Sequence, residues 1–200
     1  MQLLQALRAA TGNGAAQFLS GSQEDEVRAA LAVHEDRLVI QPTGSGKTLL
    51  YQLPALLHRD RVIVVVCPLT ALQDDLLRRC NDAGIDTVML EDRDAMPARI
   101  VLTMVEATES REYGAYVRAL VAHGRLHCII VEEMYLALLS CNYRPAMRNL
   151  YLNLRPNSNA YRRRAPDIAL TATCPPRLTK KMLDYCGMEE ETTHLSLIHI

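Results

Sequence analysis

The sequence has few aromatic residues: Phe, Trp and Tyr together make up 4% of its 200 residues, with no Trp and a single Phe. Few side chains are therefore available to stack on nucleic-acid bases. An excess of charge of one sign is also missing, since 22 Lys and Arg stand against 23 Asp and Glu. This balance argues against a polybasic nucleic-acid tail and against disorder of the whole chain. Any nucleic-acid partner would have to be held by a local patch.

Long apolar runs and closely paired cysteines are absent as well. No apolar stretch approaches the roughly 18 residues of a membrane span, and the first residues lack the order of a secretion signal. The six cysteines form no C-x-x-C pair, and the histidines show no metal-ligand spacing, so we predict free thiols and no zinc site. We expect a soluble, intracellular protein without a membrane partner, nuclear or cytoplasmic, with the nucleus favoured in a eukaryote.

Hydrophobic residues make up 49% of the chain, which suits one domain with a packed core. Short β-branched runs alternate with stretches of helical spacing, the order that is typical of βαβ units. We predict strands at 38–40, 62–67, 100–105, 128–131 and 168–171, with a weaker one at 87–90. We predict helices at 47–57, 71–80, 110–122 and 145–154. The run 62–66 is apolar at every position, as in an interior strand. The fold class is therefore α/β, with a mostly parallel sheet covered by helices on both faces.

A glycine-rich loop follows the first predicted strand. Residues 41–48 read Q-P-T-G-S-G-K-T and lead into an apolar helix, the order that phosphate binding requires. The residues expected to hold a nucleotide are Thr43, Gly44, Ser45, Gly46, Lys47 and Thr48. The glycines let successive N–H groups turn toward one anion, Lys47 would reach the β- and γ-phosphates, and Thr48 would ligate Mg²⁺. Gln41 stands where the strict pattern has Gly. The alternative, a plain glycine-rich turn, leaves Lys47 and Thr48 unexplained.

Two adjacent carboxylates, Glu132 and Glu133, follow the predicted strand 128–131. Ligands of open parallel sheets lie beyond the carboxyl ends of the strands, where this pair should stand. Glu132 would hold Mg²⁺ through water, and Glu133 would polarise the attacking water. Glu133 and Lys47 are thus the predicted catalytic residues. A bare Glu-Glu pair equally suits a solvated helix start, and the phosphate loop favours the nucleotide site.

A series of short motifs resembles the RecQ-type DNA helicases of superfamily 2. The similar segments are 41–56 (motif I), 66–75 (motif Ia), 132–135 (the D-E-x-H box), 143–145 (the F-R-P that follows it) and 169–173 (motif III). Upstream, Phe18 and Gln23 resemble the family's adenine-reading glutamine element. The resemblance covers about residues 18–188. It argues against the alternative of a P-loop kinase or transporter ATPase.

The resemblance implies the first of two RecA-like domains in a motor that uses ATP and Mg²⁺ and moves 3′ to 5′ on single-stranded or forked DNA. It implies that Gln23 contacts adenine, an amide-to-base pairing known from nucleic-acid readout. The residues implied to lie along DNA or to couple nucleotide state to DNA are Thr70, Glu106, Arg144, Thr171 and Thr173. Thr70 is equally a candidate helix N-cap.

The resemblance also divides the chain. We expect an N-terminal helical segment at 1–15, the helicase ATP-binding domain at 16–190 and a tail at 191–200. The tail fits nothing in the helicase pattern, and residues 195–200 resemble translated sequencing-adapter read-through, so we expect an artefact there. The arginines at 162–164 could touch phosphates but are more typical of a solvated loop. The second RecA-like domain, which supplies an arginine finger, is expected to be missing, so the chain alone should not unwind DNA.

Several positions depart from the family pattern. Glu132 replaces the metal-binding Asp and is one methylene longer. Met134 and Tyr135 replace the Ala-His of the box, and Tyr143 is the one aromatic left in the segment that senses DNA. Phe18 stands one residue further from the glutamine than is usual. These departures indicate a fragment or degenerate copy, and they leave open an alternative function as a catalytically decayed ATP- and nucleic-acid-binding regulatory module.

Overall fold

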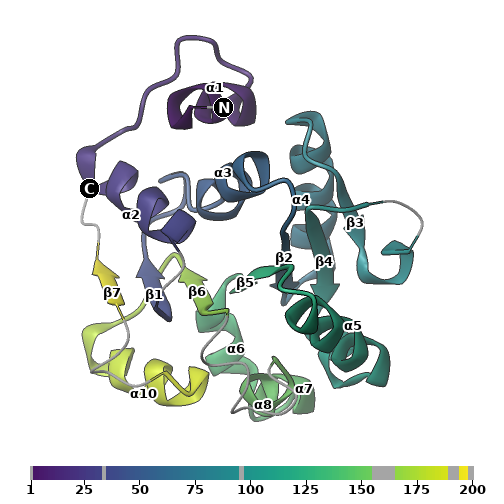
Figure 1. The fold of residues 1–200 in the computed structure, drawn as a ribbon. Coiled ribbons are helices and arrows are strands. Elements are labelled where there is room, and N and C mark those ends of the chain that lie inside the picture. The colour runs from purple at the N-terminus through teal and green to yellow at the C-terminus, as the bar shows by residue number, and fades with distance from the viewer. Residues whose placement is uncertain (1, 33–34, 95–96, 155–164, 189–193, 198–200) are drawn as a thin grey trace.

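Seven parallel strands form one sheet within the residues that the computed structural model describes, 2–32, 35–94, 97–154, 165–188 and 194–197 (Figure 1). The order across the sheet is β3-β4-β2-β5-β6-β1-β7, and each neighbouring pair is parallel. The strands are β1 (Arg37–Ile40), β2 (Val62–Cys67), β3 (Thr87–Met89), β4 (Ile100–Met104), β5 (Leu126–Val131), β6 (Asp167–Thr171) and β7 (His194–Leu197). The predicted α/β fold class is confirmed, and all six predicted strands are present. The arginines at 162–164 lie outside the described residues.

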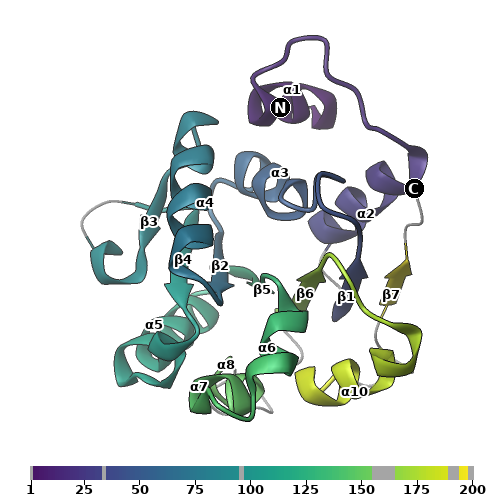
Figure 2. The ribbon, with the colours of Figure 1, turned by 180° about the vertical axis from the view of Figure 1, so that it is seen from behind.

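Helices cover both faces of the sheet (Figures 1 and 2). One face carries α1 (Leu3–Thr11), α2 (Gly21–Ala32), α3 (Leu49–Leu57) and α4 (Thr70–Asp82). The other carries α5 (Arg111–Ala122), α6 (Met134–Ser140), α7 (Pro145–Arg148), α8 (Leu150–Leu154) and α10 (Pro176–Cys186). Short 3₁₀ turns, η1 (Leu90–Asp92) and η2 (Glu106–Glu109), follow β3 and β4. In the part of the chain described here, no helix is long and apolar enough to span a bilayer.

Strand β2 explains the uninterrupted apolar run in the sequence. All six of its residues are buried, and it lies between β4 and β5. Val62, Val64 and Val66 pack in the core under α5 to α10, whereas Ile63, Val65 and Cys67 pack in the core under α1 to α4. Since successive side chains of a strand point to opposite faces, a strand covered on both sides must be apolar at every position. The predicted interior position of this strand is confirmed.

The structure differs from the sequence prediction in several elements. The helix predicted at 145–154 is divided into α7 and α8 at Asn149, whose backbone (φ −101°, ψ 7°) leaves the helical region. Helices α2, α6 and α10 did not stand out in the sequence. Residues 194–197, assigned to the tail, form β7, which pairs in parallel with β1 from Arg37↔His194 to Ile40↔Leu197. Strand β7 covers backbone groups of β1 that would otherwise be unpaired at the edge of the sheet. The strand pairing therefore extends past residue 190, where we expected the domain to end.

Candidate nucleotide site

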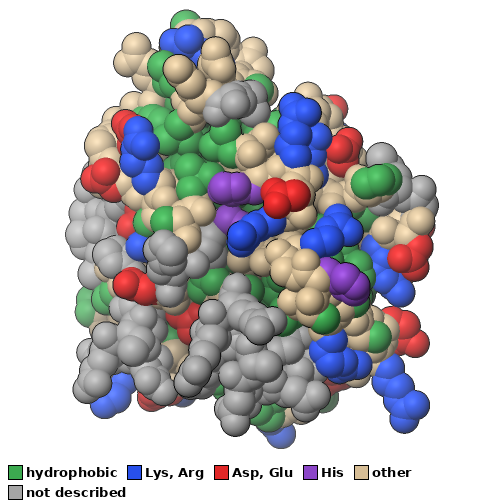
Figure 3. All heavy atoms as spheres, viewed as in Figure 1, with side chains coloured by type: hydrophobic (Ala, Val, Ile, Leu, Met, Phe, Trp, Pro, Cys, Tyr) green, Lys and Arg blue, Asp and Glu red, His purple; other side chains and the backbone are tan. Residues whose placement is uncertain are grey.

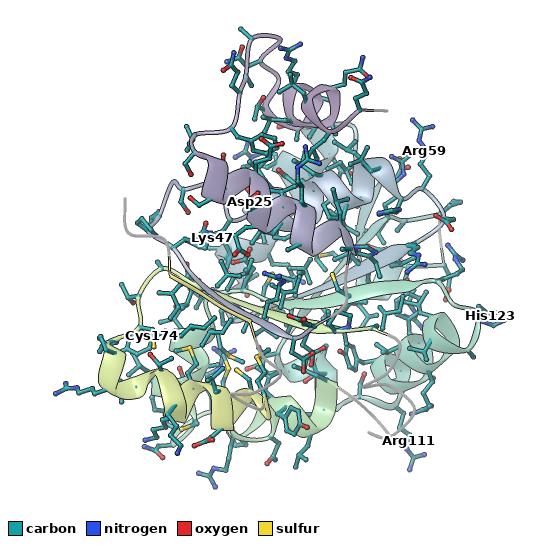
Figure 4. The ribbon with its side chains drawn as sticks, turned by 60° about the vertical axis from the view of Figure 1, so that its left-hand side comes forward. Asp25, Lys47, Arg59, Arg111, His123 and Cys174 are labelled. Atoms are coloured by element: carbon teal, nitrogen blue, oxygen red, sulfur yellow. The ribbon has the colours of Figure 1, made fainter. Side chains whose placement is uncertain are left out.

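The phosphate loop joins β1 to α3 at the carboxyl end of the sheet. Gly44 (φ +83°) and Gly46 (φ +84°) both have left-handed backbone, which residues with a Cβ rarely adopt. The Lys47 ammonium donates hydrogen bonds to the Gln41 carbonyl (2.8 Å) and the Pro42 carbonyl (3.2 Å). Lys47 therefore lies over its own loop and adds positive charge beside the N-terminus of α3. Figure 4 shows Lys47 and Cys174 at the same end of the strands, with His123 at the other end.

Gln41 braces this loop from inside. Its side-chain Oε1 accepts a hydrogen bond from the Ser45 hydroxyl (3.1 Å), and it is only 3% exposed. Its backbone N–H donates to the Thr171 carbonyl at the end of β6 (3.1 Å). The Thr171 hydroxyl in turn donates to the Thr173 carbonyl (3.0 Å), and the Thr173 side chain is exposed. Gln41, which stands where the strict pattern has glycine, thus connects the loop to Thr171 directly and to Thr173 through Thr171.

Gln23 holds the loop from the α2 side. Its Nε2 donates to the Ser45 carbonyl (2.6 Å), and its Oε1 accepts from the Leu19 backbone N–H (2.8 Å). A Cβ on Gly46 would lie 2.6 Å from this Nε2, so the glycine also permits the close approach of Gln23. Both ends of the amide are engaged with the protein. That Gln23 contacts adenine stays a prediction.

A cavity of about 750 Å³ opens beside the loop, a size common for small-molecule sites. Its walls come from the end of α1 and the segment after it, the start of α3 and the end of α4. Gly44, Gly46 and Thr48 line it together with Gln23. Arg79 and Asp82, from the end of α4, line it as well, and Arg79 is ion-paired with Asp75. Figure 3, viewed as in Figure 1, shows blue and red side chains interspersed over the coloured part of the side that faces the viewer, where neither charge predominates.

The carboxylate of Glu132 is buried at the end of β5. It is 4% exposed, and its Oε1 accepts a hydrogen bond from the Tyr51 hydroxyl on α3 (2.9 Å). Burial raises the pKa of Glu132; the Tyr51 hydrogen bond and the charge of Lys47 oppose this rise, and the charge of Glu133 adds to it. The pKa of Tyr51 is raised well above its ordinary value, mainly by burial and then by Glu132, so Tyr51 stays a neutral donor. Lys47 lowers the pKa of Glu132 because its positively charged ammonium lies near the carboxylate and favours the ionised form.

Glu133 has a left-handed backbone, with φ 46° and ψ 47°, and among the described residues it is the one non-glycine with positive φ. It precedes α6, and its carbonyl accepts from the Leu136 N–H (2.8 Å). Such a conformation costs about 1–2 kcal/mol for a residue with a Cβ. Strain of this kind tends to be kept where function requires it. The half-buried Glu133 is thus turned sharply out of the strand that carries Glu132.

Arg144 connects three segments beside the carboxyl end of β2. Its Nη1 donates to the Pro68 carbonyl (2.8 Å), while its Nε and Nη2 donate to Oε1 of Glu106 (3.0 and 2.6 Å). The segments that carry the predicted coupling residues Thr70, Glu106 and Arg144 therefore lie close together. Thr70 belongs to this group because it is exposed at the start of α4, two residues after Pro68. The N-cap position of α4 falls on Leu69, so the N-cap prediction for Thr70 is wrong. The helix extends one residue further back than its apolar pattern indicates.

The remaining departures from the family box have clear positions. Met134 is buried in the core under α5 to α10, and the half-buried Tyr135 packs against the same core. Tyr143 is 74% exposed. In the described segments of the chain, no group of three His, Cys, Asp or Glu side chains is arranged to hold a metal ion. That Thr48 and Glu132 hold Mg²⁺ stays a prediction.

A family model described as "DEAD/DEAH box helicase" matches residues 21–182. The chain belongs to this helicase family. This DEAD/DEAH box domain is 29% identical over 180 residues to "ATP-dependent DNA helicase Q5" of Mus musculus, covering 80% of the chain and 17% of that protein. It is 25% identical over 195 residues to "ATP-dependent DNA helicase RecQ" of Bacillus subtilis (strain 168), covering 90% of the chain and 31% of that protein.

A solved structure described as "DUF1998 helicase MrfA bound to DNA" has the same fold as this DEAD/DEAH box domain. The TM-score is 0.67 at 19% identity, with 96% of this chain and 27% of that chain covered. The resemblance to RecQ helicases is confirmed by these relatives, and the chain is a helicase domain of the DEAD/DEAH box family. It spans 17% of the length of the mouse relative and 31% of the length of the bacterial relative.

Sequence reasoning missed three contacts of the site. They are the hydrogen bond between Gln41 and Ser45, the one between Tyr51 and Glu132, and the one from Arg144 to the Pro68 carbonyl; the sequence draws attention to Gln41, Glu132 and Arg144 but does not indicate these partners. Tyr51 carries a weak signal, since its polar-tipped side chain follows two leucines at the start of an apolar helix. The roles of the predicted phosphate, metal and coupling residues stay predictions.

Proposed function

We propose that the chain is the ATP-binding motor domain of a RecQ-like, ATP-dependent DNA helicase. Together with a second RecA-like domain that is missing from this chain, it would move 3′ to 5′ on single-stranded or forked DNA, in the nucleus if the source is a eukaryote. The observation that carries the proposal is the meeting of the phosphate loop with a buried carboxylate, Glu132, at the carboxyl end of one parallel sheet. The DNA helicase names of its relatives support the choice of DNA as the partner.

The donor set fits a magnesium triphosphate. The Thr48 hydroxyl is a hard oxygen ligand of the kind that Mg²⁺ prefers, the Glu132 carboxylate would hold the ion through water, and Lys47 supplies charge for the phosphates. Bound ATP would supply the phosphoryl group that is transferred to water. Glu133, turned out of β5 by its left-handed backbone, would orient that water and accept its proton. Gln41, bonded to the Thr171 carbonyl, would carry movement of the loop to motif III.

Nucleotide affinity tests the core of the proposal. We expect Lys47→Ala to weaken ATP·Mg²⁺ binding at least tenfold, because it removes the charge that faces the phosphates. Lys180→Ala is the matched control, since Lys180 is exposed on α10, and it should leave the affinity unchanged. Equal affinities of the wild type and Lys47→Ala, measured by calorimetry, would refute nucleotide binding by this loop.

The need for a second domain is tested by turnover. An arginine finger contributes about 10³–10⁵ in rate, so the chain alone should show little DNA-stimulated ATPase. Supplying a second RecA-like domain should raise the rate by at least 10³-fold. If the chain alone hydrolyses ATP as fast as it does with the second domain added, the expected need for a second domain is wrong.

A catalytically decayed regulatory module is the second candidate. The observation that favours it is Tyr135, which packs against the apolar core where the family has a histidine. The test is the double variant Glu132→Asp and Tyr135→His with a second domain supplied. No gain in ATPase would favour the regulatory module, whereas a gain would favour a motor weakened at these two positions.

A further inference from the structure

A buried hydrogen bond ties the first turn of α3 to the end of β5. The Tyr51 hydroxyl donates to Oε1 of Glu132 at 2.9 Å, although the two residues are 81 positions apart. Tyr51 is 0% exposed and Glu132 is 4% exposed. Tyr51 lies three residues after Thr48, so the contact stands directly beneath the phosphate loop. A buried carboxylate and a buried phenol each need a partner, and here each supplies the other.

The surroundings leave the Tyr51 hydroxyl as the strong side-chain donor to this carboxylate. The ring is packed in the core under α1 to α4, with Cys67 and Cys80 as neighbours, and thiols are weak donors. The hydroxyl stays protonated because burial raises the pKa of Tyr51, so it can only donate to the ionised acid. Hydrogen bonds from the Tyr51 hydroxyl and from the Glu133 backbone both favour the charged form of Glu132. A carboxylate has about four acceptor positions, so capacity for a metal is left.

We propose that Tyr51 is a positioning residue for Glu132 and makes glutamate usable at a position where the family has aspartate. Glutamate is one methylene longer and has one more rotatable bond than aspartate, so without a fixed partner its carboxylate would sample several directions. Holding Oε1 at the ring hydroxyl sets the other carboxylate oxygen toward the site. The inference rests on the proposed function, since it assumes that Glu132 serves Mg²⁺.

A double-mutant cycle between positions 51 and 132 tests the role of Tyr51. The readouts are the Mg²⁺ concentration that gives half-maximal ATP binding and, without nucleotide, the urea midpoint of unfolding. We expect Tyr51→Phe to raise the half-saturating Mg²⁺ concentration about fivefold. In the Glu132→Asp background the same change should have less than a twofold effect, because the shorter side chain no longer reaches the hydroxyl. Equal effects in both backgrounds would overturn the proposal and assign Tyr51 to packing alone.

Tyr113→Phe is the matched control. Tyr113 is also 0% exposed and its hydroxyl donates to the Leu154 carbonyl (3.4 Å) on the opposite face of the sheet. We expect it to lower the urea midpoint without changing the Mg²⁺ requirement. Should Tyr51→Phe fail to fold, Tyr51→Met takes its place with the same expectation, since Met fills irregular space well.

The failures of the two proposals look different. If the wild type binds no ATP, or binds it equally well after Lys47→Ala, the proposed function falls and the role of Tyr51 falls with it. If ATP binding requires Lys47 but Tyr51→Phe leaves the Mg²⁺ requirement unchanged, the role of Tyr51 alone falls. If Tyr51→Phe raises the Mg²⁺ requirement in the wild type but not in the Glu132→Asp background, both the proposed function and the role of Tyr51 are supported.

Discussion

At the scale of single residues, three positions on or next to β5 are unusual: two ionisable side chains are buried, and one residue with a Cβ has left-handed backbone. Glu132 is an acid buried at 4% exposure, and Glu133 beside it has left-handed backbone. His127, at the opposite end of β5, is buried at 2% exposure. Each of these features costs free energy in the folded state, so each has a measurable consequence for stability.

Glu133→Gly should stabilise the protein. Glycine adopts φ 46° without the strain of a Cβ, which is worth about 1–2 kcal/mol, and part of that gain is lost to the greater freedom of glycine in the unfolded chain. We expect a net gain of about 0.5–1 kcal/mol in the free energy of unfolding, measured in urea. Glu133→Gln is the control, because it removes the charge and keeps the strain. A gain of the same size in that variant would show that charge repulsion with Glu132, not backbone strain, sets the cost.

His127 should make stability depend on pH. Burial lowers the pKa of His127 to about 4, while the contact with the Ala30 carbonyl (3.0 Å from Nε2) partly opposes the shift and the nearby His58 adds to it. The folded state therefore binds this proton less readily than the unfolded chain, where the pKa is about 6.5. The stabilisation is complete above pH 6.5 and declines as the pH falls toward 4, with a loss of about 2 kcal/mol by pH 5.

Urea unfolding of the wild type and of His127→Gln, each at pH 7.5 and pH 5, measures this contribution. The variant cannot take up the proton, so its stability should fall less between the two pH values. Carboxylates titrate in both proteins and cancel in the comparison. An equal fall in both proteins would mean that His127 is not the group responsible.

At the scale of elements, the phosphate loop is held from three directions. Gln23 on α2 bonds to Ser45, Gln41 bonds to Ser45 from within the loop, and the backbone of Gln41 bonds to Thr171 on β6. A loop bonded to the end of β6 in this way will shift if that strand end shifts. The two glycines of the loop are equivalent in backbone conformation but not in surroundings, and this difference can be tested.

Gly46→Ala should cost at least twice as much stability as Gly44→Ala. Both positions have φ near +84°, so each substitution should cost about 1–2 kcal/mol through backbone strain. A Cβ at Gly44 meets no atom within 4 Å, whereas one at Gly46 would lie 2.6 Å from Nε2 of Gln23. Thermal or urea unfolding of both variants measures the difference. Adding Gln23→Ala to Gly46→Ala should recover part of the loss; no recovery would exclude the contact with Gln23 as its cause and leave the one with Leu49 Cδ1 at 3.1 Å.

At the scale of the whole molecule, one sheet places the phosphate loop, Glu132 and Thr171 at the carboxyl ends of its strands. Strands β1, β5 and β6 end together, so the phosphate loop, Glu132 and Thr171 meet although they come from distant parts of the chain. Strand β1, which leads into the loop, has β6 on one side and β7 on the other. The position of the loop therefore depends on residues close to the end of the chain.

A chain that ends at Met188 should be less stable by about 1–3 kcal/mol, because β1 loses the ladder that it forms with β7 and each net hydrogen bond is worth about 1 kcal/mol. A chain that ends at Leu197 keeps β7 and serves as the control, with unchanged stability expected. Urea unfolding of the three proteins gives the comparison. Equal stability of the chain ending at Met188 and the full chain would support the expectation that this segment is a dispensable tail.

The fold class, the buried β2 strand and the phosphate loop were predictable from the sequence, because their signals are local. Apolar runs of strand length, three-and-four helical spacing and the order Gly44, Gly46, Lys47, Thr48 are each readable within a short window. The expectation of a helicase domain followed from several such segments in the right order, and the DEAD/DEAH box family match over 21–182 confirms it.

Only the tertiary structure decided which side chains of these separate segments contact one another. The partners of Glu132 and Arg144 come from segments 38 to 81 residues away, and the local sequence does not show that Tyr51 bonds to Glu132 or that Glu106 and Pro68 bond to Arg144. The same holds for residues 194–197, whose pairing with β1 depends on free backbone groups, which any sequence supplies. Local composition sets which elements form, and the packing of distant elements against one sheet sets which polar groups must satisfy one another.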